Sequence, residues 1–203
     1  MSTPTLRHPY INSFSDEHVP HELMFRWHPA SRGLRLDYTD RVEQDRLYGV
    51  LWACHGQQMT GRPQFKTVNT ARQRRSMRYR LCQVCAAPAV DPDTGRLWML
   101  LTDEPFTAAT GERFTHLPPT CRDCIPIALR HCPRLRRWHV LYTVASYEPY
   151  AVQADIYQPG PALEAVMEER EVTVELDRFR ALDHALAKQL LVALDDLELS
   201  ELL

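Results

Sequence analysis

Alternating apolar and polar residues predict several strands along this chain. Residues 33–38 (GLRLDY) and 169–177 (EREVTVELD) place apolar side chains on one face at every second position, which is typical of a half-buried strand. Short apolar runs at 47–54 and 96–101 also predict strands, although the first of these could instead end a helix that begins near Asp40.

A hairpin and two longer helices follow from the same pattern. Apolar runs at 138–147 and 150–157 predict a hairpin around Glu148-Pro149. Asn69 or Thr70 can cap a helix that runs to about Leu81, with a narrow apolar stripe and arginines on most of its remaining circumference. Near the C-terminus, helical spacing predicts an amphipathic helix of about five turns from the positions Phe179, Leu182, Leu186, Leu190, Ala193 and Leu197.

The N-terminal residues behave differently from the rest. Residues 1–30 are rich in His and Pro and have no sustained periodicity, so we expect an extended or loosely ordered segment there. Residues 31–203 are long enough for a single domain with its own core. The predicted fold class is α+β: a small mixed sheet around a cysteine-rich module at 81–137, covered on one face by the C-terminal helix.

Two pairs of cysteines carry the clearest chemical signal. Cys82 and Cys85 form one CxxC pair, and Cys121 and Cys124 form a second. Two such pairs, brought together by intervening chain that doubles back, predict a tetrahedral Zn²⁺ site. A shell of four cysteines has no open position for water or substrate, so the predicted role of the metal is structural. The alternatives are unrelated thiols that happen to be paired in sequence, or a redox disulfide.

The surroundings of the pairs indicate a treble-clef-like module. A strand and a Pro-Asp-Thr-Gly turn follow the first pair, and the second pair precedes a short apolar helix at 125–132. A cysteine pair, a hairpin and a second pair at a helix N-terminus is the ligand order of a treble clef. His131 or Cys132 could replace one ligand, and Cys54-His55 is a further spare pair.

These motifs resemble a group of uncharacterised double-CxxC zinc proteins from high-GC bacterial genomes. The resemblance rests on the Gly61–Phe65 segment, the Arg72–Arg75 run, both cysteine pairs and the Cys132–Arg136 segment. This chain departs from it at Ala86, where a glycine commonly follows the first pair, and in its leucine-rich tail. The resemblance implies an architecture and no particular activity.

Charge is segregated along the sequence although the formal net charge is only -2. Arginine supplies 22 of the 24 basic residues, a skew that high-GC codon usage explains as readily as phosphate binding does. Residues 46–90 contain no acidic side chain, whereas residues 164–201 are acidic. This separation of charge between segments is more informative about binding partners than the net charge is.

The arginines make nucleic-acid binding the leading functional hypothesis. One cluster leads into the first cysteine pair and another follows the second, each beside an aromatic residue, Tyr79 or Trp138, that could stack on unpaired bases. The predicted contacts with DNA or RNA are Arg72, Arg74, Arg75, Arg78, Arg80, Arg134, Arg136 and Arg137.

Two other classes of function remain open. The basic surface could bind an acidic protein, or the acidic C-terminal helix could bind a partner or a second copy of the chain. A treble-clef nuclease would use histidines such as His116, His131 and His139 around a second metal, but the usual sequence context is absent, and we expect no catalytic activity. Without a signal sequence or an apolar span, the predicted location is the cytoplasm.

Overall fold

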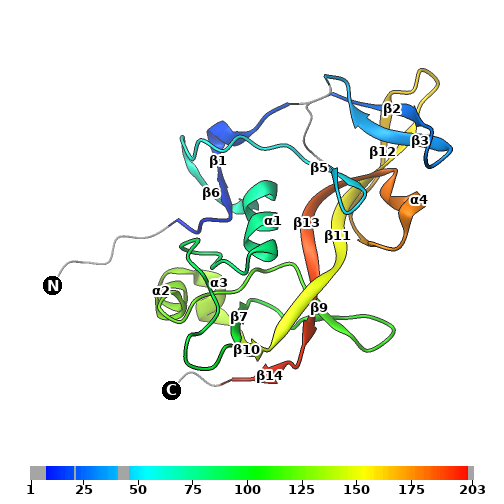
Figure 1. Ribbon diagram of the computed structural model, residues 1–203. Helices are drawn as coiled ribbons and strands as arrows, with labels where there is room; N and C mark the ends of the chain where they lie inside the picture. The colour runs from blue at the N-terminus through cyan, green and yellow to red at the C-terminus, as the bar shows by residue number, and fades with distance from the viewer. Residues whose placement is uncertain (1–7, 21, 41–45, 201–203) are drawn as a thin grey trace.

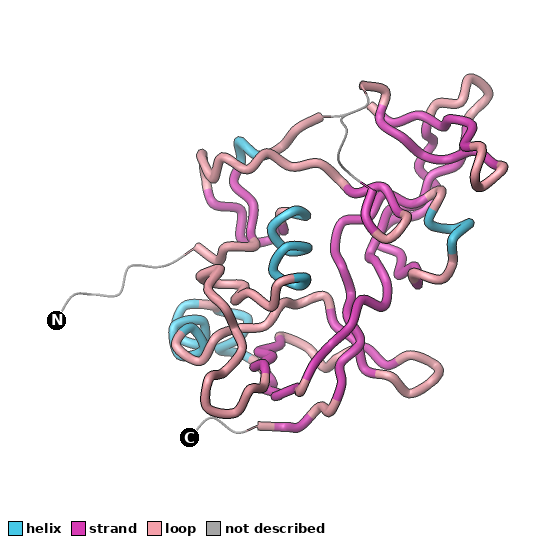
Figure 2. Tube along the Cα trace, in the orientation of Figure 1, coloured by secondary structure: helices cyan, strands magenta, loops and turns pink. Residues whose placement is uncertain are grey.

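The computed structural model describes residues 8–20, 22–40 and 46–200, and strands predominate in it (Figures 1 and 2). The elements in chain order are β1 (Asn12–Phe14), the 3-10 turn η1 (Ser15–Glu17), β2 (Leu23–His28), β3 (Gly33–Tyr38), β4 (Arg46–Leu47), β5 (Val50–Trp52), β6 (Pro63–Val68), α1 (Thr70–Arg78), β7 (Leu97–Leu101), β8 (Phe106–Thr107), β9 (Arg113–Thr115), α2 (Cys124–His131), α3 (Pro133–Arg137), β10 (Val140–Val144), β11 (Ser146–Pro159), β12 (Ala165–Glu175), α4 (Phe179–Leu182), β13 (Ala185–Asp195) and β14 (Glu198–Leu199).

The largest sheet is built around β11 and β13. Within the described residues it has seven strands, ordered β12-β11-β13-β5-β4, with β9 also paired to β13 and β8 to β9. The β11–β13 pairing is antiparallel and long, from Ser146↔Asp195 to Ile156↔Ala185, and β5 joins β13 in parallel. Figure 1 shows these two strands curving side by side through the length of the molecule. The mixed helix-and-sheet class predicted from the sequence is confirmed.

The predicted C-terminal helix is wrong. Only the single turn α4 is helical, and Ala185–Asp195 forms the strand β13, which lies between β11 and its other neighbours β5 and β9. Both faces of this strand are covered in its centre, where Leu190, Leu191 and Val192 are all buried. A strand buried on both faces is apolar without alternation, and a short run of that kind cannot be distinguished from a helix by periodicity. Pairing with β11 along its whole length overrides the helical propensity of the segment.

The predicted hairpin at 138–157 is also wrong. Both strands exist, but β10 pairs with β7 and β14 while β11 pairs with β12 and β13. Glu148 and Pro149 are part of β11, where Pro149 faces Val192 next to a register shift. Proline is tolerated in a strand at such an irregularity. The true hairpin partner of β11 is β12, through a turn at residues 160–164.

The N-terminal segment is folded where the structure describes it. Residues 1–7 and 21 lie outside the described residues, but β1 pairs with β6 and β2 pairs with β3. Phe25 is completely buried in a small apolar cluster with Leu36 and Tyr38. The segment that was expected to be loosely ordered therefore contributes two paired strands, β1 and β2, and the core residue Phe25.

Helix α1 is the element that joins the N-terminal segment to the main sheet. Asn69 caps it by accepting a hydrogen bond from the N–H of Arg72, as the sequence predicted. Gln73 is fully buried and uses its side-chain amide against β13: it donates to the Leu190 carbonyl at 2.9 Å and accepts from the Leu190 N–H at 2.9 Å. Met77 enters the main core from the same face of the helix.

A buried ion pair fastens the N-terminal segment to the first turn of α1. Arg72 lies within 2.5 and 2.7 Å of the two carboxylate oxygens of Glu17, and both residues are at most 2% exposed. The Glu17 carboxylate also accepts hydrogen bonds from the Phe14 N–H, the Met59 N–H and the Asn69 side chain. Burial alone would raise the pKa of Glu17, but the hydrogen bonds from Arg72, Phe14 and Asn69 outweigh it and lower that pKa.

The main core runs from β13 to the cysteine-rich module without a break. Trp52, Met77, Cys82, Leu97 and Leu190 belong to one buried cluster. The core therefore supports a single folding unit across the described residues of this region. No helix among the described residues is both long and apolar enough to cross a membrane.

Removing the arginine of the buried ion pair should destabilise the fold strongly. We expect Arg72→Met to lower the free energy of unfolding by about 3–5 kcal/mol, because Glu17 would remain buried without its counter-charge. The exposed Arg75 on the same helix supplies the matched control, and Arg75→Met should change stability by about 0.5 kcal/mol or less. Urea denaturation of both variants measures the difference, and equal losses would contradict a special role for Arg72.

The same site makes a pH-dependent contribution to stability. The pKa of Glu17 is lowered from 4.5 in the folded protein, so its contribution is complete above pH 4.5 and is lost as the pH falls through the folded-state pKa. We expect the stability difference between the wild type and Glu17→Gln to narrow as the pH is lowered toward 3. Denaturation curves over this pH range test this, and a constant difference would rule out ionised Glu17 as the cause.

Candidate metal centre and arginine-rich surface

The four cysteines of the two CxxC pairs meet in space. The sulfur atoms of Cys82, Cys85, Cys121 and Cys124 all lie within 4.8 Å of one another, and the Cys85 and Cys121 sulfurs are 3.7 Å apart. Sulfurs around a tetrahedral metal with bonds of about 2.3 Å are separated by about 3.8 Å. All four are free thiols, so no disulfide competes with metal binding. The arrangement can hold one metal ion.

The first pair lies in a tight turn directly after α1. Cys82 exchanges backbone hydrogen bonds with residues 86 and 87: its N–H donates to the Ala87 carbonyl and its carbonyl accepts from the Ala86 N–H. The Val84 N–H donates a hydrogen bond to the Cys82 sulfur at 3.4 Å. Ala86 has φ of 62°, a left-handed conformation that glycine adopts without strain. Alanine at position 86 therefore occupies a conformation that suits glycine better.

The second pair lies at the start of α2. The Cys121 carbonyl accepts hydrogen bonds from the N–H groups of Cys124, at 2.9 Å, and Ile125, at 3.3 Å. Pro118 and Pro119 precede the pair and are buried, which fixes the direction from which the chain approaches. Cys124 is the first residue of the helix, as the sequence predicted.

Direct hydrogen bonds join the two turns. The Gln83 N–H donates to the Pro119 carbonyl at 2.8 Å, and the Gln83 side chain donates to the Thr120 hydroxyl at 2.8 Å. The Thr120 N–H in turn donates to the Trp98 carbonyl on β7. Sequence reasoning missed Gln83 and Thr120, whose only signal is that each is adjacent to a cysteine. They keep the two pairs in register independently of any bound ion.

Burial and the neighbouring sulfur atoms oppose ionisation of two of these thiols, Cys121 and Cys124. Burial raises the pKa of Cys121 to about 11, and the nearby Cys82 sulfur contributes in the same direction. Burial and the charge at Cys82 also raise the pKa of Cys124. For Cys85, burial acts upward, but hydrogen bonds from the Ala87 N–H and the neighbouring thiols lower its pKa. Four clustered thiols cannot all ionise unless a cation compensates their charge.

The other suggested ligands lie elsewhere. Within the part of the chain that is described, the metal-ligand side chains that gather in threes or more are these four cysteines, and neither His131 nor Cys132 joins them. Cys132 instead packs against an apolar cluster that contains Ile125 and Leu135. Cys54 contacts the separate cluster around Phe25.

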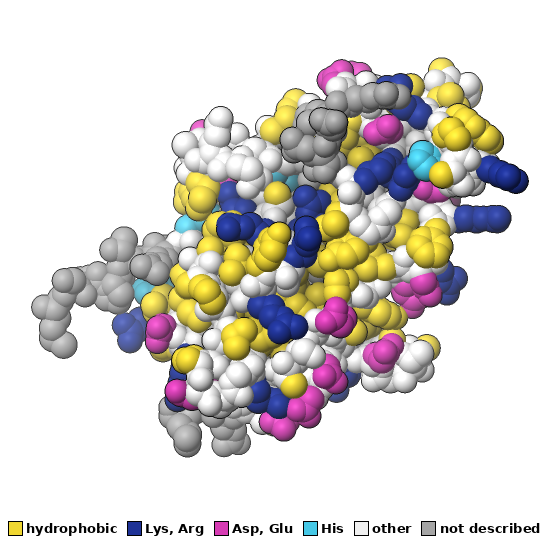
Figure 3. Space-filling view, in the orientation of Figure 1, with side chains coloured by type: hydrophobic (Ala, Val, Ile, Leu, Met, Phe, Trp, Pro, Cys, Tyr) yellow, Lys and Arg dark blue, Asp and Glu magenta, His cyan; other side chains and the backbone are white. Residues whose placement is uncertain are grey.

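The arginines of α1 divide between the interior and the surface. Arg72 is buried against Glu17, so it does not belong to an exposed basic face, contrary to the sequence-based expectation. Arg75 and Arg78 are exposed. Arg74 lies over the Trp52 ring and Arg80 over the Tyr147 ring, and both are half-buried. Figure 3 shows basic side chains gathered over α1 on this face of the molecule.

The second arginine cluster lies on α3, after the second cysteine pair. Arg134, Arg136 and Arg137 are all exposed, and Arg134 forms an ion pair with Asp103. Both members of that pair are more than two-thirds exposed, so the interaction is weak and leaves Arg134 able to exchange partners. Trp138 follows the cluster and is 44% exposed. Tyr79, at the end of α1, is 60% exposed with the Arg78 guanidinium over its ring.

The histidines of the nuclease alternative do not form a second metal centre among the described residues. His116 is held beside the Phe106 ring, and burial lowers its pKa. His139 uses its Nδ1 to bind the Leu135 carbonyl, so that nitrogen is not available to a metal.

Loss of one clustered cysteine should release the metal. We expect the wild-type protein to bind one divalent ion per chain and Cys124→Ser to lose it, with a drop in unfolding free energy of about 3 kcal/mol or more. Cys132→Ser is the control, since Cys132 lies outside the cluster and is the C-cap of the helix that begins with Cys124, and it should retain the ion. Elemental analysis and thermal denaturation measure both effects. Equal metal content in the two variants would contradict this assignment of ligands.

Searches of family models, curated proteins and solved structures found no match to this chain. The role of the protein therefore has to be inferred from the chemistry of its own side chains.

Proposed function

We propose that the four cysteines hold a structural Zn²⁺ ion. The donor set supports this choice, because four thiolates in a tetrahedral arrangement suit Zn²⁺ and leave no coordination position for a substrate. Each pair lies in a turn whose backbone is already hydrogen-bonded, and hydrogen bonds from Gln83 join the turns. The ion would balance the negative charge that four clustered thiolates bring together.

The order of elements around the ion resembles a treble clef. A cysteine turn comes first, β7 follows, and the second pair begins α2. The bridge between Val90 and Leu97 closes a short turn between them, as the N-terminal half of such a module requires. The extended pairing of β7 is with β10, which comes after the helices, so the module would be a variant in which the sheet is completed from outside.

Around this centre, we propose a nucleic-acid-binding surface without catalytic activity. The observation that carries the proposal is the solvent-facing side of α1, where Arg75 and Arg78 accompany the exposed Tyr79 directly before the first cysteine turn. The opposite side of the helix is fixed to the sheet by Gln73 and to the N-terminal segment by Arg72. A rigid helix that presents cations and an exposed ring is suited to phosphates and unpaired bases.

The exposed arginines of α3 would add to this surface. Arg134, Arg136 and Arg137 stand beside the exposed Trp138, so a second aromatic residue accompanies a second cationic cluster. The metal centre lies between the two clusters along the chain, because α1 leads into the first pair and α3 follows α2. Binding an acidic protein through the same arginines is the competing proposal. The separate alternative, in which an acidic C-terminal helix is the contact surface, is wrong, because Ala185–Asp195 forms the inner strand β13.

Charge reversal on α1 should strongly weaken the binding of nucleic acid. We expect Arg75→Glu/Arg78→Glu to weaken binding of random-sequence single-stranded DNA and RNA at least tenfold at low salt. It should also reduce the slope of log K against log salt by about 1.4, corresponding to about 0.7 for each lost single-strand contact. Fluorescence anisotropy at several salt concentrations measures both quantities.

The control reverses two exposed arginines on other elements. Arg170 on β12 and Arg180 on α4 allow Arg170→Glu/Arg180→Glu, which changes the net charge by the same amount. This variant should bind nearly as well as the wild type. If both double variants lose binding equally, the effect is one of net charge; if the wild type fails to bind even at low salt, the arginines have another partner, and the acidic-protein alternative takes precedence.

A further inference from the structure

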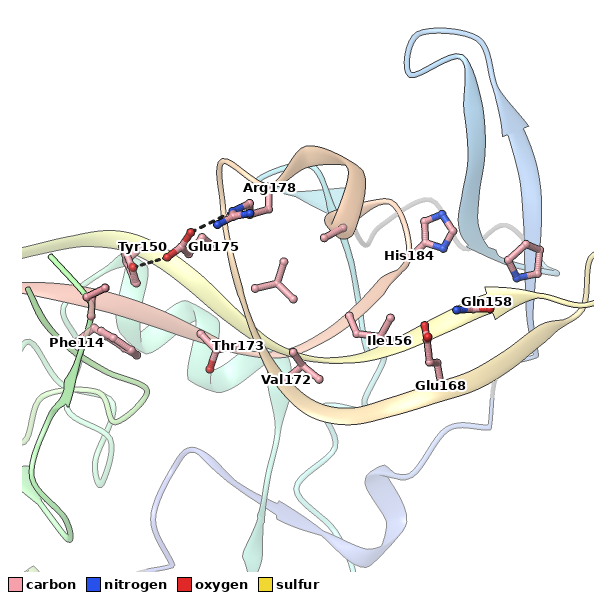
Figure 4. A pocket seen from close by; sticks show the side chains of 15 residues that line it. Phe114, Tyr150, Ile156, Gln158, Glu168, Val172, Thr173, Glu175, Arg178 and His184 are labelled. Carbon is pink, nitrogen blue, oxygen red and sulfur yellow. Dashed lines mark hydrogen bonds and ion pairs between the residues drawn. The ribbon is translucent and has the colours of Figure 1, made fainter.

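A large cleft lies along the concave side of the β11–β12 hairpin, away from the cysteines and from α1. Its volume is about 800 Å³, within the range of sites that enclose small organic ligands. Figure 4 shows its lining side chains: the hairpin forms one wall, and α4 with the start of β13 faces it. From Tyr150 to Gln158 the wall extends over eight residue steps of strand, roughly 26 Å at about 3.3 Å per residue.

The middle of the cleft is apolar. Ile156 on β11, Val172 and Val174 on β12 and Ala181 on α4 line it, and Phe114 of β9 closes one side. Val172 and Ile156 lie in the central part of the view in Figure 4. An apolar stretch of this length favours a ligand with an extended hydrocarbon body over a compact polar one.

One end of the cleft presents hydrogen-bond acceptors. The His184 Nδ1 atom lies 3.1 Å from the Tyr157 carbonyl. Because a carbonyl only accepts, Nδ1 is the donor, and in that tautomer Nε2 is the acceptor nitrogen of the ring. Glu168 and Gln158 line the same end, and within the described residues Glu168 is in no ion pair of 4.0 Å or less. An anionic carboxylate, an imidazole nitrogen and an amide oxygen together suit a strong donor with a positive charge.

The other end is already satisfied internally. Glu175 accepts a hydrogen bond from the Tyr150 hydroxyl at 2.8 Å and pairs with Arg178 at 3.3 Å, as the dashed lines in Figure 4 show. Arg178 therefore neutralises Glu175, and the uncompensated charge of the cleft lies at the Glu168 end.

From this distribution of surfaces we propose that the cleft binds an elongated primary amine. The hydrocarbon body would lie along Ile156, Val172 and Val174, and the ammonium group would be held by Glu168, with His184 Nε2 and the Gln158 amide oxygen as further acceptors. This site is separate from the metal centre and from the arginine surface of α1. The proposed amine site does not depend on whether the protein binds nucleic acid.

Three octyl compounds that differ only in the head group test this assignment. Octylammonium, octan-1-ol and octanoate share the hydrocarbon body, and isothermal titration calorimetry measures their affinity for the full-length protein. We expect octylammonium to bind at least tenfold more tightly than octanol and octanoate to bind least. Affinities in any other order would overturn the proposed charge selectivity.

A matched pair of variants locates the ammonium group. Glu168→Gln removes the charge of a residue that lines the cleft, while Glu169→Gln removes an equal charge from the next residue on β12, which is exposed and does not line it. We expect Glu168→Gln to weaken octylammonium binding about fivefold and to leave octanol unchanged, and Glu169→Gln to change neither. Equal effects of the two variants would mean a diffuse field, and no effect of either would refute the assigned acceptor.

A third variant tests the hydrocarbon part of the site. Ala181→Phe places a bulky ring on the wall opposite the hairpin, where Ala181 is exposed and so tolerates a larger side chain. We expect it to weaken octylammonium and octanol alike, by at least tenfold, without lowering the melting temperature. Unchanged binding of both compounds would show that they bind outside this cleft.

Discussion

The convergence of four cysteine sulfurs constrains the rest of this structure. Cys85 and Cys121 are 36 residues apart, and the chain between them includes the turn at residues 91–95, β7 and the β8–β9 arm. Closing a loop of that length costs about 3–4 kcal/mol in chain entropy on the estimate used for disulfide loops. A metal held by both ends would offset that cost and would also compensate the charge of the thiolates. It would fix α1, which precedes the first pair, relative to α2, which begins with the second.

A second set of polar contacts, on the buried side of α1, also fixes the position of this helix. Gln73 binds both backbone groups of Leu190 on β13, and Arg72 meets the Glu17 carboxylate in the interior. Buried polar groups of this kind are costly unless they are fully hydrogen-bonded, so they specify one orientation of the helix. The consequence for function is that Arg75 and Arg78 point to solvent because their neighbours are required inside.

The sequence predicted best what depends on local chemistry. The capping residue Asn69, the strand with Leu97 and the pairing of cysteines all follow from short spacings that allow few alternatives. The C-terminal segment shows the limit: Leu186, Leu190 and Ala193 have helical spacing, yet they lie on β13. The reason is that β11, whose paired residues lie 31 to 45 positions earlier, pairs with one edge of the run, and β5 and β9 pair with the other. Arg72 shows the same limit for charge. Nothing in its own run of arginines distinguishes it from Arg75, and the difference arises only from Glu17, which lies 55 residues earlier.

The small net charge results from opposite charges that lie on separate parts of the surface. The buried side of α1, opposite Arg75 and Arg78, is attached to β13 at Leu190, whereas the cleft with Glu168 adjoins His184 just before that strand. The two attachment points are six residues apart, which is roughly 20 Å along an extended chain at about 3.3 Å per residue. The Debye length at physiological ionic strength is about 8 Å, so fields at this separation are largely screened from each other. A net charge of -2 therefore does not describe a weakly charged surface. It is the sum of a basic surface on α1 and a carboxylate at one end of the cleft.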